Sequence, residues 1–354
     1  MQLSALRHWS LGILANGTTT YVLKRVLQAG LTLFLASALC FFIVQLTPGD
    51  YLDTLRQNPQ ISPERIEELR QQFGLDQPAW RQYLNWLWQI VRPRWQAWGP
   101  LGFWIPNLNF GNSFVYNRTV GSLILERMVA TLLLTIAAIV LTWAIAIPLG
   151  VIAAVNQNRW LDRLLRVLSY IGQGFPSLVT ALLLLILAQN VSPLLPVGDM
   201  TSLDFAEFSW PGQLLDLGWH LFLPALALSI TGFAGLQRIT RGEMLDVLRQ
   251  DYIRTARAKG LPEQRVIYGH ALRNAINPLI TILGFEFSTL LSGAFVTEFF
   301  FNWPGLGRLI LQAVLAKDLY LVMASLMMGA TMLVLGNLLA DLLLKFSDPR
   351  IQLS

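Results

Sequence analysis

The apolar part of this chain carries few residues that could do chemistry. Only two acids lie within its long apolar segments, Glu286 and Asp341, and Asp341 is expected to pair with Lys345 one helical turn later. The single Cys40 excludes an intrachain disulfide, and the three scattered histidines lack the spacing of a zinc site. No phosphate-binding loop, no H-E-x-x-H helix and no G-x-S-x-G turn occurs. The sequence therefore predicts no enzyme, no metal site and no cofactor bound by this chain.

Glu286 is the acid whose position most needs an explanation. An ionisable group within a membrane span costs about 2.5 to 3.5 kcal/mol, so it should face protein or a water-filled path. It either contacts substrate on such a path, for example a peptide ammonium group, or forms a fixed hydrogen bond with another span, and the bond is favoured. Asn277, Ser288 and Ser292 add a partly polar stripe to the same segment, although such residues also pack between helices. These four residues are the candidate translocation path.

The most distinctive polar segment is DYIRTARAKGLP, from Asp251 to Pro262, between two apolar segments. Asp251 places a negative charge at a helix N-terminus, and Gly260 followed by Leu-Pro is a helix stop. A second short helix is predicted to start at Pro262, which suits a first helical position. Small residues such as Ala256 and Ala258 would let a partner approach closely. On composition alone, however, a solvated loop that stays in the cytosol is the favoured interpretation.

The composition indicates an integral membrane protein. Hydrophobic residues make up 54% of the chain and charged residues 13%, with a mean hydropathy of +0.50, whereas soluble domains carry about 25% charged residues. A membrane span needs roughly 20 apolar residues. Six segments qualify, namely Val26–Leu46, Val129–Val155, Val167–Leu195, Trp219–Leu236, Ala275–Thr297 and Leu319–Phe346.

The charges indicate an orientation. If the N-terminus is cytoplasmic, most Lys and Arg residues fall on the cytoplasmic side, and the short outside loop from Ser192 to Gly218 carries four acids without any Lys or Arg. Both termini are therefore predicted to be cytoplasmic. The net charge of +5 follows from this membrane topology, so no nucleic acid partner is expected.

The predicted organisation has four parts. Residues 1–25 form a cytoplasmic segment, 26–46 the first transmembrane helix, 47–128 a small external (periplasmic) domain, and 129–354 a five-helix core whose cytoplasmic loop spans 239–274. The external segment is rich in tryptophan. These side chains suit either the membrane headgroup layer or the core of the domain itself, and both interpretations stay open.

Pro and Gly residues are predicted to interrupt two of the spans. Gly172, Gly174 and Pro176 lie near the start of the third span, and Pro148 and Gly150 lie in the second. Such residues permit kinks and close packing, and here a gate is no better supported than simple tight packing.

The polar loop also resembles a known family. Residues 252–261, YIRTARAKGL, with HALRN at 270–274 and Pro278, match the cytoplasmic loop of permease subunits of binding-protein-dependent ATP-binding-cassette (ABC) importers, in the dipeptide/oligopeptide/nickel branch. The general E-A-A form of the superfamily is not met, because Arg254 and Thr255 stand at its first two positions. Further matches follow in the family's order, namely TPGD at 47–50, FGLD at 73–76, GNS at 111–113, GQGFP at 172–176, HLFLP at 220–224, FNWPGLG at 301–307 and DPR at 348–350.

The resemblance implies an all-α integral membrane protein of six transmembrane helices with the type I ABC importer permease fold, in the bacterial inner (plasma) membrane. It implies a second, similar permease subunit, two cytosolic ATPase subunits that bind ATP and Mg, and an external substrate-binding protein. The helix at 251–260 would couple the chain to an ATPase, with the residues Asp251, Tyr252, Arg254, Thr255, Ala256, Arg257, Ala258, Lys259, Gly260 and Leu261.

The resemblance further implies that the substrate is a di- or oligopeptide. Nickel or an oligosaccharide is the alternative cargo within the family. A secondary transporter that uses Glu286 and an ion gradient is the alternative outside it. Such a transporter would usually show two related halves and several charges within its spans, and the sequence has neither.

Overall fold

The computed structural model describes residues 17–56, 60–92, 94–98, 103–107, 109–191 and 195–347. Within these ranges the side chains of residues 17–23, 54, 94–98, 103–107, 231, 281, 284–285, 287–293, 339–340 and 342–347 are not described. The chain forms two compact units. The first unit comprises Met1–Leu27, Leu132–Trp303 and Met332–Ser354, and the second comprises Gln28–Thr131 and Pro304–Thr331.

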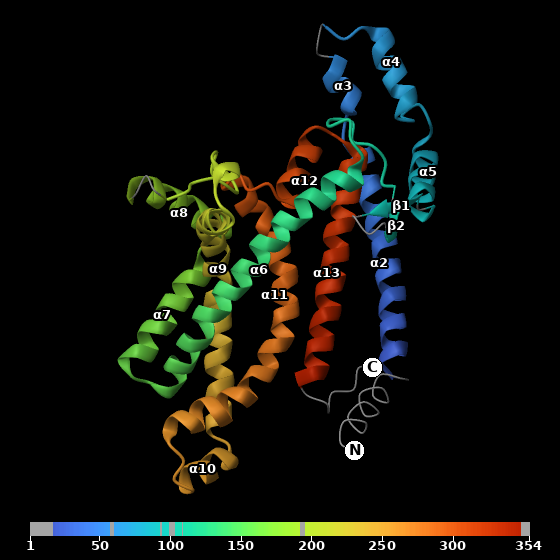
Figure 1. The fold of residues 1–354 in the computed structure, drawn as a ribbon. Coiled ribbons are helices and arrows are strands. Elements are labelled where there is room, and N and C mark those ends of the chain that lie inside the picture. The colour runs from blue at the N-terminus through green and yellow to red at the C-terminus, as the bar shows by residue number, and fades with distance from the viewer. Residues whose placement is uncertain are drawn as a thin grey trace. The chain divides into compact units, whose positions relative to one another are not determined.

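Helices occupy the six predicted spans, the third as a bent pair that ends at Val191. The helices are α2 (Gly17–Leu46), α6 (Val120–Val155), the pair α7 (Trp160–Gly174) and α8 (Ser177–Val191), α9 (Trp210–Leu248), α11 (Leu272–Phe300) and α13 (Leu319–Ser347) (Figure 1). Among the described residues four helices are long and apolar enough to cross a membrane, and a fifth span results if α7 and α8 count as one. Helix α11 has 29 residues, about 40 Å of helix, which exceeds the apolar thickness of a bilayer.

The third predicted span is broken rather than straight. Helices α7 and α8 meet at an angle of 103°. The break falls at Phe175, whose φ of −90° and ψ of 124° are extended, because Pro176 disfavours the helical conformation at the residue before it. The predicted interruption near Gly174 is therefore confirmed, and it is a sharp bend rather than a slight kink.

The second span is not interrupted, contrary to the sequence prediction. Helix α6 continues through Pro148, and Gly150 serves close packing against α9. A Cβ atom at Gly150 would lie 2.6 Å from Cβ of Thr240 and 3.0 Å from the backbone oxygen of Gln237. At this position the structure supports tight packing.

We expect a Gly150→Ala variant to be less stable than the wild type by about 1 to 3 kcal/mol, the usual cost of overpacking. Gly174→Ala is the matched control, because a Cβ there meets nothing within 4 Å. Thermal unfolding of the detergent-purified protein would measure both. Equal stability of the two variants would contradict the close approach of α6 and α9.

The second unit joins the predicted external segment to residues 304–331. It contains α3 (Tyr51–Arg56), α4 (Pro63–Gln72), α5 (Ala79–Val91), α12 (Leu306–Leu315) and an antiparallel hairpin of β1 (Arg94–Trp98) and β2 (Phe103–Asn107). Ile66, Leu69 and Phe73 recur at helical spacing, which predicts a helix near 63–73 and is confirmed by α4, whereas the hairpin was not predicted. The buried Asp318 accepts hydrogen bonds from Oγ of Ser113 at 2.6 Å and from the backbone N–H of Val115 at 3.2 Å. These bonds attach the segment after α12 to the segment before α6.

The tryptophans of α5 divide between the two interpretations that the sequence left open. Trp86 is buried and donates from Nε1 to the backbone oxygen of Phe110 at 3.1 Å, so it belongs to the core of the unit. Trp80 and Trp88 are 59% and 56% exposed. The side chains of Trp95, Trp98 and Trp104 lie outside the described residues.

Helix α5 also lies beside the first predicted span. The hydroxyl of Tyr83 is 2.8 Å from Oγ of Ser37, and its ring centroid is 5.2 Å from that of Phe41. Ser37 and Phe41 are both inside the apolar segment that the sequence predicts as a span. The exposed apolar side of α5 is therefore placed where lipid would cover it.

We expect Leu84→Cys to react far more slowly than Asn85→Cys with a membrane-impermeant maleimide in intact vesicles, in a background without Cys40. Leu84 is 53% exposed on the apolar side of α5, whereas Asn85 lines a polar pocket on the other side. Lipid shields a thiol from an aqueous reagent only on the first side. Equal labelling rates would contradict a lipid-facing α5.

Candidate coupling site

The predicted helix of the polar loop is present as α10, Asp251–Ala258 (Figure 1). It begins after Gln250, whose extended backbone (φ −69°, ψ 149°) precedes the first turn. Within that turn Arg254 lies 3.2 Å from the Asp251 carboxylate, and Oγ1 of Thr255 donates to the Asp251 backbone oxygen at 3.0 Å. Asp251 therefore lies in the first turn of α10, where the sequence predicted it.

Gly260 ends α10 in a left-handed conformation with φ of +75°. The N–H of Gly260 donates to the oxygen of Arg257 at 2.9 Å, and the N–H of Leu261 donates to that of Ala256 at 3.4 Å. This bond pair defines a Schellman motif, which favours glycine because glycine adopts positive φ without steric cost.

An ion pair across the turn supports this ending. Nη2 of Arg257 lies 2.6 Å from Oε1 of Glu263, at the start of the next helix. The hydrogen bond from Arg257 holds the pKa of Glu263 below its usual range and raises the pKa of Arg257. The pair therefore contributes to the stability of the folded chain above the ordinary pKa of glutamate. This contribution is lost as the pH falls through the lowered pKa of Glu263. Because both side chains are about half exposed, we expect this contribution to be small.

The second predicted helix is also present, and it begins with a π-helical stretch. Its first turn starts after Pro262, whose backbone oxygen accepts from the N–H groups of Arg265 and Val266. A π-helical stretch, Arg265–Ala271, then continues without a break into α11. The segment that follows the α10 turn therefore runs directly into a predicted span.

One side of α10 is buried against its own chain. Ile253 is fully buried, and Ala256 is 8% exposed. They pack in one apolar cluster with Met244 of α9, Ala275 of α11 and Val151 of α6. The cluster therefore connects α10 to three of the long helices.

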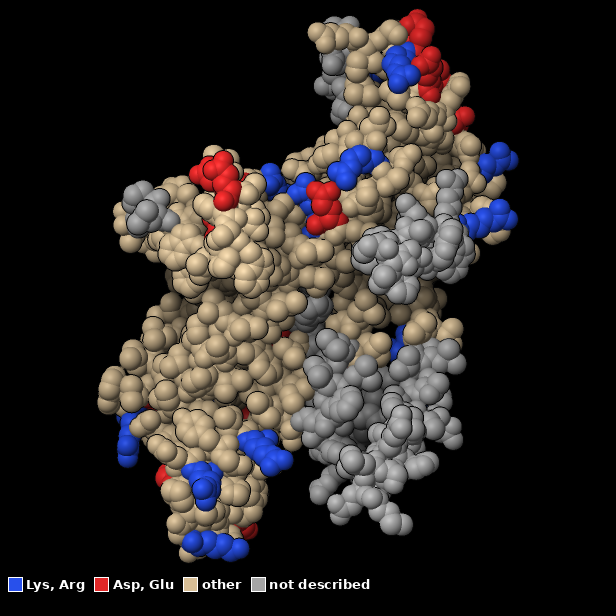
Figure 2. Space-filling model, viewed as in Figure 1, with Lys and Arg blue, Asp and Glu red and all other residues tan. Residues whose placement is uncertain are grey.

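The opposite side of α10 is open. Tyr252, Arg254, Thr255, Ala258 and Lys259 are all exposed, and Figure 2 shows Lys and Arg side chains gathered around α10. The predicted coupling residues thus fall into two groups. Asp251, Arg257 and Gly260 are exposed as well, whereas Ala256 faces inward and Leu261 packs at the edge of the cluster. Small size at Ala256 therefore serves packing within this chain.

Sequence reasoning missed two further features of this surface. Tyr268, in the π-helical stretch, is 57% exposed. A hollow of about 260 Å³ next to α10 is lined by Ala154, Val155, Gln157, Leu245, Leu248, Arg249, Arg257 and Glu263. No local pattern marks this hollow, because its lining residues come from three separate segments.

A buried ion pair connects α7 to α9 in the first unit. The carboxylate of Asp162 accepts from Nε and Nη2 of Arg241 at 2.6 and 2.9 Å, and from the backbone N–H of Asn158 at 2.9 Å. The Asp162 side chain is fully buried and that of Arg241 is 17% exposed. The pair is 79 residues apart in sequence, so no local pattern predicts it.

Glu286 has a hydrogen-bond partner on another helix. Nε1 of Trp143, on α6, donates to Oε2 of Glu286 at 2.6 Å. This is the kind of bond that the sequence favoured over substrate contact. Asn277 is nine residues earlier on α11, which places it about half a turn away around the helix. The side chains of Ser288 and Ser292 lie outside the described residues.

Asp341 lies next to Arg25. Its carboxylate is 3.5 Å from Nη2 of Arg25, a partner that the sequence did not suggest. The side chain of Lys345, the predicted partner, lies outside the described residues.

Ser202, in the loop before α9, lies beside a histidine and an aspartate of α9 without forming a catalytic triad. Oγ of Ser202 is 3.2 Å from Nε2 of His220, and Asp216 lies on the side of this same ring nitrogen at 3.7 Å. Nδ1 of the ring faces the backbone oxygen of Gly198 instead. A catalytic triad needs the acid and the nucleophile on opposite ring nitrogens, whereas here both lie at Nε2. The contacts instead attach the loop to α9.

Two family models match the chain. The model described as "Binding-protein-dependent transport system inner membrane component" matches residues 146–353, and the N-terminal model of the same system matches residues 18–135.

Curated relatives match along almost the whole length. The oligopeptide transport system permease protein AppB of Bacillus subtilis (strain 168) is 37% identical over 333 residues, which cover 94% of this chain and 99% of that protein. The dipeptide transport system permease protein DppB of Escherichia coli (strain K12) is 36% identical over 348 residues, covering 94% and 98%.

A solved structure has a similar fold. A chain from the inward-facing MetNI methionine ABC transporter superposes with a TM-score of 0.54 at 14% identity, covering 64% of this chain and 97% of that one. The helical membrane fold of a type I permease is thereby confirmed. The chain belongs to the family of inner membrane components of binding-protein-dependent transport systems, and it is a non-catalytic permease subunit.

Proposed function

We propose that this chain is a permease subunit of an ATP-driven importer of di- and oligopeptides. Relatives named as oligopeptide and dipeptide permeases, 36 to 37% identical over 94% of the chain, support the choice of substrate. In this proposal the chain forms half of the translocation path beside a second, similar permease. Two cytosolic ATPases bind ATP and Mg, and an external binding protein delivers the peptide.

The observation that carries the coupling role is that α10 is buried on one side and exposed on the other. Its open side, with Thr255 and Ala258, would dock against an ATPase. Its inner side, with Ile253 and Ala256, packs in the cluster that joins α6, α9 and α11. Protein interiors are close-packed and resist compression, so a push on α10 would move these helices together. ATP-dependent movement of the ATPases would then rearrange the spans.

The proposed orientation has both termini and the loop 239–274 in the cytoplasm. Within the first unit, basic side chains gather around α10, and acidic side chains gather on the loop before α9 (Figure 2). This distribution suits the positive-inside rule. Residues 47–128 would then lie outside the inner membrane, apart from the lipid-facing side of α5. Glu286, Asn277, Ser288 and Ser292 remain candidates for the path, with Glu286 held by Trp143 in the described conformation.

Transport by the complex reconstituted in proteoliposomes tests this function. We expect uptake of a labelled tripeptide that requires ATP on the α10 side and that persists when ionophores collapse all ion gradients. Labelled nickel and maltotriose would be measured in parallel. Uptake of either one in place of the tripeptide would refute the peptide substrate. Uptake that needs an ion gradient and no ATP would refute the ATPase-driven mechanism.

A further inference from the structure

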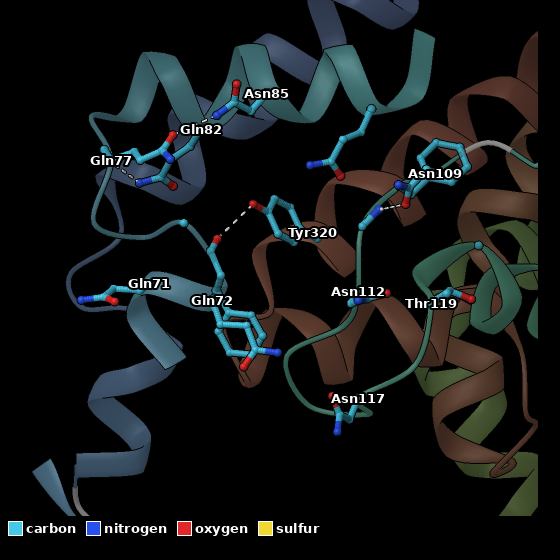
Figure 3. A pocket seen from close by; sticks show the side chains of 16 residues that line it. Gln71, Gln72, Gln77, Gln82, Asn85, Asn109, Asn112, Asn117, Thr119 and Tyr320 are labelled. Atoms are coloured by element: carbon cyan, nitrogen blue, oxygen red, sulfur yellow. Dashed lines mark hydrogen bonds between the residues drawn. The ribbon is translucent and has the colours of Figure 1, made fainter. Parts of the chain in front are cut away.

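The second unit contains a pocket that the transport mechanism above does not use. Its volume is about 670 Å³, within the range of ligand sites in proteins. One wall comes from the end of α4, the following turn and α5, and the other comes from the segment 109–121, with Tyr320 between them (Figure 3). All lining residues belong to the same compact unit.

The lining is rich in amides and uncharged. Nine of the sixteen described lining residues are Asn or Gln, and none of the sixteen is acidic, basic or histidine. A carboxylate, phosphate or ammonium group would meet no countercharge among these side chains. The pocket therefore suits a neutral ligand with many hydrogen-bonding groups.

Several amides of the pocket are fixed and others are available. Asn85 donates to Oε1 of Gln77 at 2.9 Å, and Gln82 donates to the Gln77 backbone oxygen at 2.8 Å, which holds the α5 wall in place. Among the described residues, no hydrogen bond is present for the side chains of five others on both walls, namely Gln71, Gln72, Gln89, Asn112 and Asn117. Each of these amides carries both a donor and an acceptor, as a peptide unit does.

The aromatic residues of the pocket leave little ring surface for a sugar. Phe73 packs on Phe114 at a centroid distance of 4.3 Å, and Phe114 in turn contacts Tyr320 at 5.2 Å. The ring of Tyr320 is also approached by Gly111, where an added Cβ would lie only 3.1 Å away. Its hydroxyl donates to the backbone oxygen of Phe73 at 3.2 Å (Figure 3). Phe73 and Tyr320 are thus packed against Phe114, and Phe110 is only 8% exposed, so a sugar would lack an aromatic face to stack on.

We infer that this pocket binds the uncharged main chain of a peptide through hydrogen bonds from amides on both walls. The free termini of the peptide lie outside the pocket, because its lining has no charge to receive them. The inference deepens the proposed function and adds a peptide site within this chain itself. It is tested by binding to the chain alone, so its failure can be told apart from a failure of peptide transport.

The experiment measures binding to the full chain in lipid nanodiscs by isothermal titration calorimetry. The probes are tetra-alanine with an acetylated N-terminus and an amidated C-terminus, and maltotetraose. The variants are Gln72→Ala and Asn117→Gly, one from each wall. Alanine suits the helix end at Gln72, and glycine keeps the φ of +51° at Asn117. Gln264→Ala is the control, because it removes an exposed amide in the other unit.

We expect the capped peptide to bind the wild type and the control equally, and to bind each pocket variant roughly 2- to 10-fold more weakly, as the loss of one hydrogen bond implies. Maltotetraose should bind more weakly than the peptide. The inference is overturned if the capped peptide does not bind, if it binds both pocket variants as tightly as the wild type, or if maltotetraose binds more tightly.

Discussion

A Gly260→Val variant should assemble with its partners but import substrate roughly 5- to 150-fold more slowly than the wild type. Gly260 has φ of +75°, a backbone region in which a β-branched residue is strained by about 1 to 3 kcal/mol. A strain of this size lowers the population of the correct turn roughly 5- to 150-fold. Without that turn α10 is no longer held between α9 and α11. The measurement is the ATP-dependent uptake rate per assembled complex.

The matched control is Gly260→Asn. Asparagine tolerates the left-handed region, so this variant should retain most of the uptake. A Cβ at this position meets nothing within 4 Å, so both variants test the backbone conformation rather than a clash. If the valine variant imports at the wild-type rate while fully assembled, the turn is not needed for coupling.

An Asp162→Ala variant should be less stable by about 3 to 5 kcal/mol. The substitution would leave Arg241, only 17% exposed, without its bidentate partner. Removing one partner of a buried ion pair is costly because the other charge stays buried without compensation. Thermal or denaturant unfolding of the purified chain measures the effect. Glu68→Ala is the control, because the Arg65–Glu68 pair is also short, at 2.8 Å, but mostly exposed, and its loss should cost about 1 kcal/mol or less.

A double variant separates the pair from the packing around it. Asp162→Ala with Arg241→Leu removes both charges, so it should lose less stability than Asp162→Ala alone. If the double variant is less stable than Asp162→Ala alone, packing rather than the unpaired charge explains the loss.

The sequence predicted the parts of the fold that depend on local patterns. Apolar length located all six helical segments, and the Gly-Leu-Pro stop located the end of α10. The bend at Phe175 could be predicted as an interruption, because Pro176 restricts its neighbour, but the angle depends on packing elsewhere.

Contacts between distant residues could not be predicted. Glu286 and Trp143 are 143 residues apart, and Ser113 and Asp318 are 205 residues apart, so a single sequence carries no signal for either pair. The orientation of α10 was similarly undetermined. Alanine fits both a buried packing position and an exposed docking surface, and only the structure distinguishes the inward Ala256 from the outward Ala258.

This difference between the two alanines defines the most direct test of the account. A charge at Ala256 would disturb the apolar cluster, whereas Ala258→Glu alters only the exposed side of α10. The measurement is purification of the chain in mild detergent from its native host, with mass spectrometric identification of stoichiometric companions. Leu203→Glu, at a fully exposed residue of the loop before α9, is the matched control.

We predict that the wild type and the control bring down ATPases with a phosphate-binding loop and a second permease, and that Ala258→Glu keeps the second permease but loses the ATPases. Recovery of the wild-type chain without an ATPase, or retention of the ATPases by Ala258→Glu at the wild-type stoichiometry, would contradict docking through α10.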